Sequence, residues 1–226
     1  MTAANRIALP PEEFQRLVCG AAWAQFEEHG EAIAEMMRQQ GLLAKGSRLL
    51  DVGCGCGRIA RWLVDDPIGS YLGFDRHRGM IDWCRENFSD AAPHFDFRFY
   101  DLKSAYSDLD GQRGDLDPEE FEFPFEAGSF DSVVLVSVFT HMPLGEIEAY
   151  LRNLHRILAP GGRILLSVFF AEAEPEVIGL GFYHRQETLE SLFERRGFAA
   201  KQLWPTRYGP KHNWYLLRTT DRKHSM

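Results

Sequence analysis

The chain has 226 residues, 45% of them hydrophobic, and a formal net charge of −8. This length suits one domain with a sizeable core, and no stretch approaches the roughly eighteen consecutive apolar residues of an ordinary membrane span. Residues 101–130 hold nine Asp or Glu against two Lys or Arg, so most of the negative charge falls in one segment. Binding to duplex nucleic acid depends on a basic stripe, and because none is present we expect no nucleic-acid partner.

The cysteine content predicts reduced thiols. The cysteines are few and irregularly spaced, at Cys19, Cys54, Cys56 and Cys84, which is not the pattern of a disulfide framework. Residues 1–14 lack the long apolar segment of a secretory signal peptide. We therefore expect a cytoplasmic protein with free thiols and no membrane association.

The first predicted element is helical and spans residues 11–44, with Gly41 as its natural end. Its apolar residues recur at spacings near three and four residues: Phe14, Leu17, Val18, Ala21, Ala22 and Ala24. We expect residues 1–45 to form a helical lid or cap on a domain of residues 46–226.

From Arg48 onward, short apolar runs alternate with helical patterns. The expected strands are residues 48–52, 70–75, 95–100, 130–139, 162–170, 198–204 and 213–220. Helices are expected near residues 58–65, 79–88, 144–158 and 186–196. Continuous apolar runs such as "SVVLVSVF" indicate strands buried on both faces. Their alternation with helices predicts a doubly wound, parallel α/β sheet with helices on both faces.

Two segments depart from this alternation. Only seven residues separate Trp204 from His212, too few for a helical crossover, so the final strand should run antiparallel. The acidic segment, residues 102–129, lies between the third and fourth strands, and we expect it to be an insertion that forms a solvated loop.

The most specific local pattern is the glycine-rich loop "DVGCGCGR" after the first strand. Ligands of open parallel sheets bind beyond the carboxyl ends of the strands, so this loop is the first place to look for a ligand. A dinucleotide fingerprint, G-x-G-x-x-G, would need glycine where Arg58 stands, and the G-K-[ST] ending of a Walker loop is absent. The spacing is instead D-x-G-x-G-x-G, formed by Asp51, Gly53, Gly55 and Gly57.

With this loop, the chain resembles the class I S-adenosylmethionine-dependent methyltransferases, in the branch that modifies small molecules. The resemblance rests on the loop, on Asp75 at the end of "YLGFD", on Asp101 in "FRFYDL" and on the "APGG" turn before the fifth strand. It covers residues 46–170 well and the last two strands loosely. It implies a seven-stranded sheet in the order 3-2-1-4-5-7-6, with strand 7 antiparallel.

The resemblance also implies how S-adenosylmethionine binds, with S-adenosylhomocysteine as its product. Asp75 is expected to accept hydrogen bonds from both ribose hydroxyls, and Asp101 and Leu102 to bind the adenine. Backbone groups of the glycine loop and of Ser137 are expected to hold the methionine end. The full set of expected cofactor residues is Asp51, Gly53, Gly55, Gly57, Arg58, Asp75, Arg76, Met80, Asp101, Leu102 and Ser137.

His141 is the expected catalytic base. A hydroxyl acceptor loses a proton during methyl transfer, and His or a carboxylate commonly takes it. His141, in "SVFTHMP", follows the carboxyl end of the fourth strand. The alternative is that its ring caps or packs a loop through backbone hydrogen bonds.

We expect no metal. Residues 136–145 contain no Asp or Glu, whereas metal-dependent catechol-type methyltransferases use an acidic cluster at the exit of the fourth strand. Cys54 and Cys56 form a Cys-x-Cys pair, not the C-x₂₋₄-C pairs of zinc sites. We expect both to be small apolar fillers beneath the loop.

The acceptor pocket should be built from parts outside the shared core. The candidates are Trp23, Phe26, the 101–129 loop, Tyr183, His184, Tyr208 and His212, although such aromatic side chains more often pack a core or a lid. The resemblance favours methyl transfer to a hydroxyl oxygen of a sugar or another secondary metabolite. The alternatives are a protein or RNA methyltransferase, and a non-catalytic S-adenosylmethionine-binding regulatory domain. The sequence carries no signal for an oligomeric state.

Overall fold

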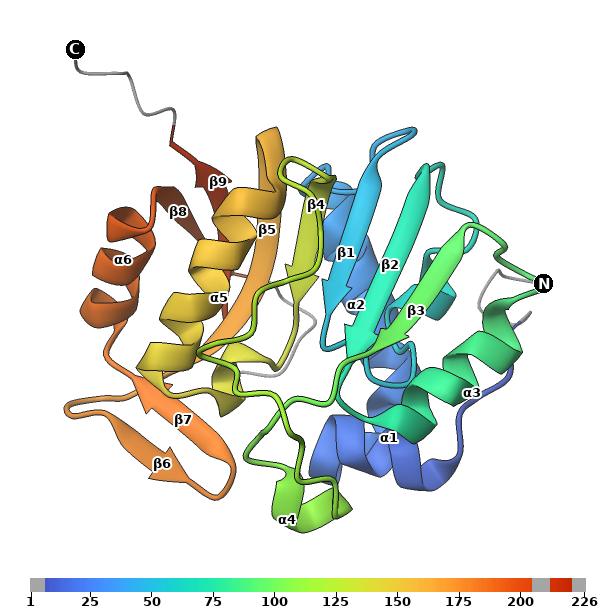
Figure 1. Cartoon of the computed structure of the whole chain (residues 1–226), viewed down its shortest axis with the longest axis horizontal. Coiled ribbons are helices and arrows are strands. Elements are labelled where there is room, and N and C mark those ends of the chain that lie inside the picture. Colours follow the sequence, from blue (N-terminus) through green and yellow to red (C-terminus); the bar gives the residue numbers. More distant parts are fainter. Residues whose placement is uncertain (1–6, 205–211, 221–226) are drawn as a thin grey trace. The chain divides into compact units, whose positions relative to one another are not determined.

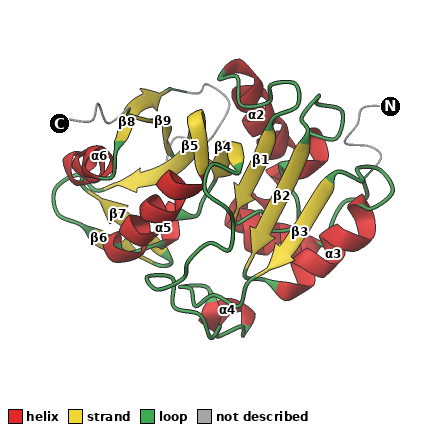
Figure 2. Ribbon diagram, turned by 45° about the horizontal axis from the view of Figure 1, so that its top comes forward, coloured by secondary structure: helices red, strands yellow, loops and turns green. Residues whose placement is uncertain are grey.

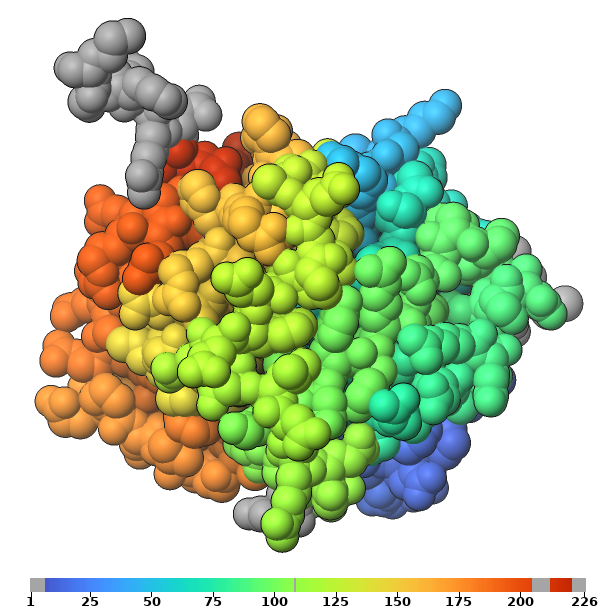
Figure 3. Space-filling model, in the orientation of Figure 1, coloured from blue at the N-terminus to red at the C-terminus, as the bar shows by residue number. Residues whose placement is uncertain are grey.

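The computed structural model describes residues 7–204 and 212–220. These residues form two compact units that divide between Asp101 and Leu102, and Figure 1 labels their helices and strands. Within the described residues, no helix combines the length and the apolar character that a membrane crossing needs. Part of the acidic segment, coloured green to yellow-green, lies at the surface in Figure 3.

The first unit contains three parallel strands in the order β3-β2-β1 (Figure 2). They are β1 (Arg48–Val52), β2 (Ser70–Asp75) and β3 (Phe95–Phe99). Leu49 and Leu50 are neighbours in β1 that point to opposite faces of the sheet, and both are fully buried. This confirms the expectation of a strand covered on both faces, and it confirms the first part of the predicted strand order.

The helices of the first unit are α1 (Glu12–Cys19), the 3₁₀ helix η2 (Gly20–Gln25), α2 (Phe26–Gln39), the 3₁₀ helix η3 (Ala60–Trp62) and α3 (Arg78–Phe88). The helical stretch expected over residues 11–44 is therefore broken. The break falls at Gly20, whose φ of 55° is outside the right-handed helical region. Gly41 also has a positive φ, and its N–H donates to the carbonyl of Arg38, so the predicted end of the segment is confirmed.

The prediction of a helix over residues 58–65 is wrong, because the structure has only the single 3₁₀ turn η3 in this segment. The amides of Trp62 and Leu63 donate to carbonyls three residues earlier, at 2.9 and 3.0 Å. Such hydrogen bonds wind the chain more tightly than an α-helix and rarely extend beyond one turn. Ala60 and Leu63 are fully buried, so tertiary packing decides the local conformation here.

The second unit contains most of the elements that follow Leu102. In chain order they are α4 (Ser107–Asp110), β4 (Phe130–Leu135), η4 (Phe139–His141), α5 (Leu144–Ile157), β5 (Leu158–Phe170), β6 (Glu176–Ile178), β7 (Gly181–His184), α6 (Gln186–Arg195), β8 (Phe198–Leu203) and β9 (Asn213–Thr219). β4 is parallel to β5, while β9 is antiparallel to both β5 and β8. The order β4-β5-β9-β8 matches the predicted 4-5-7-6, and the antiparallel final strand is confirmed.

The second unit also contains elements that the sequence did not predict. β6 and β7 form an antiparallel hairpin, and β7 pairs in parallel with the end of β5. Residues 7–204 and 212–220 therefore contain nine strands rather than the seven predicted. The short helix α4 lies inside the acidic segment that was expected to be a loop. The sequence did not indicate the hairpin because all three residues of β6 are exposed and β7 has only four residues, so neither has the buried apolar run that marks a central strand.

Candidate functional site

The glycine loop joins β1 to η3 in the first unit. Gly53, Gly55 and Gly57 have φ values of 71°, 54° and 76°, a region that residues with a Cβ rarely adopt. The amides of Gly53 and Cys54 donate to the carbonyl of Phe74, at 2.8 and 3.0 Å. The alternating glycines therefore turn the backbone back onto the end of β2, where Asp75 stands.

Asp75 ends β2, and backbone groups fix the position of its carboxylate. Oδ1 accepts a hydrogen bond from the N–H of His77, and Oδ2 accepts one from the N–H of Gly55, both at 2.8 Å. A carboxylate oxygen can accept two hydrogen bonds, so each oxygen keeps capacity for one more donor. Two adjacent hydroxyls, as in a ribose, are the donor pair that this arrangement fits. Burial raises the pKa of Asp75, and the two backbone N–H groups act in the opposite direction.

His77, which was not among the predicted site residues, orients this carboxylate. Besides its backbone bond to Asp75, its ring Nδ1 accepts a hydrogen bond from the N–H of Met80, at 3.2 Å, as the N-cap of α3. The ring also packs edge-on against Phe14 of α1. The available sequence signal was its place directly before a predicted helix, two residues after the acid.

Asp51 in β1 is almost fully buried, with 1% of its surface exposed. Its Oδ2 accepts a hydrogen bond from the Tyr71 hydroxyl of β2, at 2.7 Å. Burial raises the pKa of Asp51 to about 7, while the Tyr71 hydroxyl and the Arg58 guanidinium favour the charged form. This carboxyl group beneath the glycine loop therefore titrates close to neutral pH.

Replacing Asp51 with Asn is expected to flatten the dependence of stability on pH. The folded pKa of about 7 lies above the unfolded value of about 3.9, so the native state binds more protons between those two pH values. Asp51 therefore makes the free energy of unfolding fall as pH rises through this window, by an amount on the order of 4 kcal/mol. Urea unfolding at several pH values measures the slope.

The matched control for this prediction is Asp82→Asn. Asp82 is a partly exposed residue of α3 that pairs with Arg85 at 3.4 Å, and its replacement removes the same formal charge while it should change the free energy of unfolding by less than about 1 kcal/mol. An Asp51→Asn protein that keeps the wild-type slope would contradict the prediction. Some slope should persist in the variant, because burial also raises the pKa of Asp75 and of Glu146.

The other candidate cofactor residues of the first unit differ in exposure. Arg58 is 5% exposed, and its Nη1 donates to Sγ of Cys19 at 3.4 Å. Met80 is 4% exposed and is part of the apolar core. Arg76 and Asp101 are both partly exposed, and Asp101 is the last residue of this unit. The roles of these residues toward a cofactor stay predictions.

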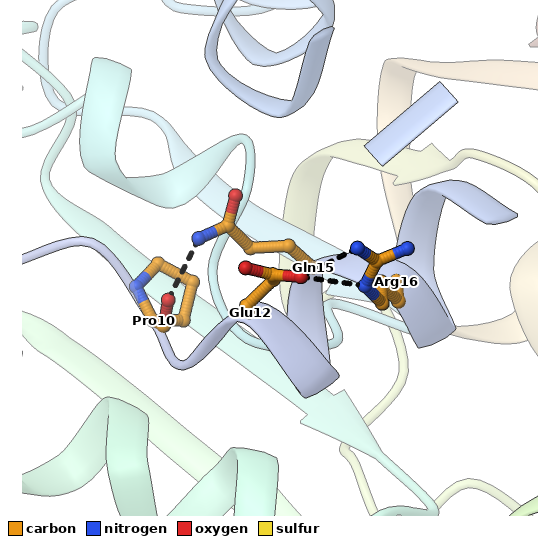
Figure 4. Close-up of polar contacts among 4 residues, drawn as sticks. All are labelled: Pro10, Glu12, Gln15 and Arg16. Carbon is orange, nitrogen blue, oxygen red and sulfur yellow. Dashed lines mark hydrogen bonds and ion pairs between the residues drawn. The ribbon is translucent and has the colours of Figure 1, made fainter. Parts of the chain in front are cut away.

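Helix α1 packs onto the glycine loop. Its side chains Phe14, Leu17 and Val18 contact a cluster formed by Phe26, Cys56 and Met80. A Cβ atom at Gly55 would lie 2.9 Å from Cγ2 of Val18, so α1 touches the loop directly. The start of α1 is held by two polar contacts, Gln15 to the carbonyl of Pro10 and Arg16 to Glu12 (Figure 4). The division into a cap of residues 1–45 and a domain of residues 46–226 stays a prediction.

Ser137 follows β4 in the second unit and has an unusual backbone conformation. Its φ is 60°, the only positive φ of a non-glycine residue in the described chain, and such a conformation costs about 1–3 kcal/mol. Its N–H donates to Oγ of the fully buried Ser167, at 3.0 Å. Leu102 also belongs to this unit, is buried, and forms a β-bridge with Leu116.

His141, the expected base, makes two hydrogen bonds. Its Nδ1 lies 2.8 Å from the carbonyl oxygen of Leu180, and its Nε2 lies 2.9 Å from the Tyr106 hydroxyl. A carbonyl can only accept, so Nδ1 carries the proton, and Nε2 of the neutral ring accepts from Tyr106. Burial lowers the pKa of His141, and the bond to Leu180 acts in the opposite direction. The ring is therefore neutral at neutral pH, with its basic nitrogen directed at Tyr106.

The expected acceptor residues fall into two groups. Phe26 is 1% exposed, and Nε2 of the buried His184 donates a hydrogen bond to the carbonyl of Met142 at 2.9 Å, so both side chains lie in the interior. Tyr183 and His212, in contrast, are partly exposed, and both pack on the partly exposed Phe169, with ring centroids 4.9 and 5.0 Å from its own. Trp23 lies under the guanidinium of Arg16. Tyr208 lies outside the described residues.

The cysteines of the loop are buried free thiols. Cys54 and Cys56 are 6% and 1% exposed, and burial raises the pKa of both. Sγ of Cys54 and Sγ of Cys84 both lie 3.7 Å from the carbonyl oxygen of Gly55. Within residues 7–204 and 212–220, no three His, Cys, Asp or Glu side chains gather as a metal site would require.

Comparison with known proteins finds one family whose members match this chain. The model of that family, described as a methyltransferase domain, matches residues 50–166, which is more than half of the 226 residues. Methyltransferase GfsG of Streptomyces halstedii is 26% identical over 140 residues, which cover 62% of this chain and 44% of that protein. The tRNA (carboxymethyluridine(34)-5-O)-methyltransferase alkbh8 of Xenopus tropicalis is 29% identical over 133 residues, 58% of this chain and 17% of that protein. The chain thus spans less than half the length of these curated relatives.

Solved structures show the same fold. One is the 1,6-didemethyltoxoflavin-N1-methyltransferase of Burkholderia thailandensis, whose structure holds 1,6-didemethyltoxoflavin and S-adenosylhomocysteine. Its TM-score is 0.62 at 15% identity, and the match covers 95% of this chain and 92% of that one. The predicted doubly wound α/β fold is therefore confirmed.

Proposed function

This chain belongs to the class I S-adenosylmethionine-dependent methyltransferases, and from that premise we propose that it transfers a methyl group from S-adenosylmethionine to a small molecule. The acceptor atom that we propose is a hydroxyl oxygen of a sugar or another secondary metabolite. The observation that carries the proposal is the Asp75 carboxylate, which is held by two backbone N–H groups and keeps one free acceptor position on each oxygen.

The residues of the first unit fit the cofactor. Asp75 would accept from the two ribose hydroxyls, and charge-assisted bonds of this kind are stronger than neutral ones. The positive φ values of Gly53, Gly55 and Gly57 form the turn that brings the N–H of Gly55 to the Asp75 carboxylate. When bound, S-adenosylmethionine supplies a methyl group on a positively charged sulfur.

His141 is the base that we propose for the acceptor hydroxyl. It follows the carboxyl end of β4, the end at which open α/β sheets bind their ligands. Its lowered pKa keeps the ring neutral, so Nε2 can take up a proton at neutral pH. Holding the acceptor in line with the methyl group would also lower the activation barrier, and such pre-organisation is worth up to about 7–11 kcal/mol.

An RNA acceptor is the second candidate, because alkbh8 carries a tRNA 5-O-methyltransferase name. The net charge of −8 argues against it, since binding to phosphate backbones depends on clustered Lys and Arg. A regulatory domain that binds the cofactor without catalysis also fits the first unit, because one fold can host unrelated functions.

We expect S-adenosylhomocysteine to raise the melting temperature of the protein, and NAD and ATP to leave it unchanged. A ligand at about 100 times its Kd adds about 2.7 kcal/mol to the free energy of unfolding. For a protein of 226 residues this corresponds to about 5–10 °C. Differential scanning calorimetry of protein freed from co-purified ligand makes the measurement. A shift with NAD but none with S-adenosylhomocysteine would contradict the proposal.

The acceptor is identified by a screen with methyl-labelled S-adenosylmethionine. Hydroxylated sugars, polyketides and phenols form the first arm, and total tRNA forms the second. Label in a small molecule supports the proposed acceptor class, and label only in tRNA supports the RNA candidate. Binding of S-adenosylhomocysteine without label transfer in either arm would favour the regulatory domain.

A further inference from the structure

Tyr106, His141 and Leu180 form a hydrogen-bonded chain within the second unit. Tyr106 immediately precedes α4, His141 ends η4, and Leu180 lies in the turn between β6 and β7. The Tyr106 hydroxyl is 2.9 Å from Nε2, and the Leu180 carbonyl is 2.8 Å from Nδ1. The Tyr106 and His141 rings also pack edge-on, with centroids 4.8 Å apart.

These two bonds occupy both ring nitrogens of His141. Nδ1 carries a proton that it donates to Leu180, so Nε2 is the only nitrogen that can take up another proton. That nitrogen already accepts from Tyr106. An acceptor molecule could therefore reach Nε2 directly only by displacing the tyrosine hydroxyl.

We propose that the Tyr106 hydroxyl is the catalytic group that meets the acceptor hydroxyl and relays its proton to Nε2 of His141. The inference rests on the proposed function, because it requires a hydroxyl acceptor. A hydroxyl suits this task, since it can accept one proton and donate another at the same time.

S-adenosylmethionine supplies the methyl group, so the acceptor oxygen gains a bond to the methyl carbon while the carbon–sulfur bond breaks and leaves its electron pair on sulfur. The acceptor's proton passes to the Tyr106 oxygen as the proton of Tyr106 passes to Nε2. The imidazolium that results keeps its bond to Leu180 and later releases the new proton to solvent.

The surroundings of His141 favour a neutral ring before the reaction. Its ring is hydrogen-bonded to Tyr106 and Leu180, and the ring centroid of Phe169 lies 6.5 Å away. Within the described part of the chain, none of these three partners carries a charge. Tyr183 and His212 also pack on Phe169. Burial is thus the main influence on the pKa of His141, and it lowers that pKa.

The test compares two probes, phenol and 4-nitrophenol, in wild-type protein and in the Tyr106→Phe and His141→Gln variants. At slightly alkaline pH, phenol keeps its proton while 4-nitrophenol is largely ionised and needs no base. We expect both variants to methylate phenol about 10²- to 10⁴-fold more slowly, the usual effect of losing general-base catalysis. The rate with 4-nitrophenol should change by only a few-fold. Tyr215→Phe is the matched control, since its hydroxyl bonds to Glu190 elsewhere in the unit, and it should keep both rates.

Two further measurements separate a relay from a purely structural pair. The wild-type rate with phenol should fall as pH drops through the lowered pKa of His141, below its ordinary value of 6.5, because protonated Nε2 cannot accept from Tyr106. Nitrogen NMR of labelled histidine in the free protein should show a protonated Nδ1 and an unprotonated Nε2 that shifts in Tyr106→Phe.

Several outcomes would overturn the relay. One is a Tyr106→Phe protein that methylates phenol at the wild-type rate, and another is an equal loss of rate with phenol and with 4-nitrophenol in the variants. A third is an NMR spectrum that shows a protonated Nε2 in the neutral ring. The last is wild-type protein that binds S-adenosylhomocysteine and methylates neither probe. Failure to bind S-adenosylhomocysteine, measured by calorimetry on the same sample, would instead refute the proposed function and the relay with it.

Discussion

Replacing Asp75 with Ala is expected to raise the Kd for S-adenosylhomocysteine by about 10²- to 10⁴-fold. The variant loses both carboxylate oxygens that would accept from the ribose hydroxyls, and each bond to a charged group contributes about 1.5–3 kcal/mol. The effect is large because both oxygens are already oriented by the N–H groups of Gly55 and His77, so the wild-type protein has little ordering left to do when it binds. Isothermal titration calorimetry gives the two Kd values.

The control for this prediction is Asp96→Ala in the neighbouring strand β3. Asp96 is exposed and pairs with the partly exposed Arg98 at 2.8 Å, and surface pairs of this kind contribute little. Asp96→Ala should therefore bind like wild type. Near-UV circular dichroism of Asp75→Ala separates lost binding from lost folding. A folded Asp75→Ala protein with an unchanged Kd would show that the carboxylate does not hold the ribose.

Replacing Gly57 with Val is expected to lower the free energy of unfolding by about 2–6 kcal/mol. A β-branched residue is strained at the φ of 76°, at a cost of about 1–3 kcal/mol. Its Cβ would also fall 2.9 Å from Cε2 and Cζ of Phe88, and overpacking adds about 1–3 kcal/mol. Phe88 is 1% exposed and cannot move without disturbing the core. Urea unfolding monitored by fluorescence measures the loss.

Gly111→Val is the matched control, because it keeps the strain and removes the crowding. Gly111 has a φ of 71°, and a Cβ there would meet nothing within 4 Å. The losses in the free energy of unfolding of the two variants should therefore differ by the overpacking cost alone, about 1–3 kcal/mol. Equal losses in the two variants would show that Phe88 yields to the added side chain. The Gly57→Val protein should also bind S-adenosylhomocysteine more weakly, since the same backbone turn places Gly55 against Asp75.

The sequence alone predicted the features that depend on local periodicity. The apolar runs indicated the strands of both units, because a strand covered on both faces must be apolar throughout. The short link between Trp204 and His212 predicted the antiparallel last strand, since a chain that cannot cross the sheet has to turn back. The pattern from Asp51 to Gly57 indicated the cofactor loop, because alternating glycines favour a positive φ.

Tertiary structure decided the rest, because it depends on contacts between distant segments. The turn η3 is shorter than its helical pattern, since tertiary packing of Ala60 and Leu63 overrides the local helical propensity. The hairpin β6–β7 exists through pairing of β7 with the end of β5, which no local pattern shows. His141 could be picked out from its place after a strand. Its bonds to Tyr106, 35 residues earlier, and to Leu180, 39 residues later, arise only when the chain folds, and they determine which nitrogen of its ring can act as a base.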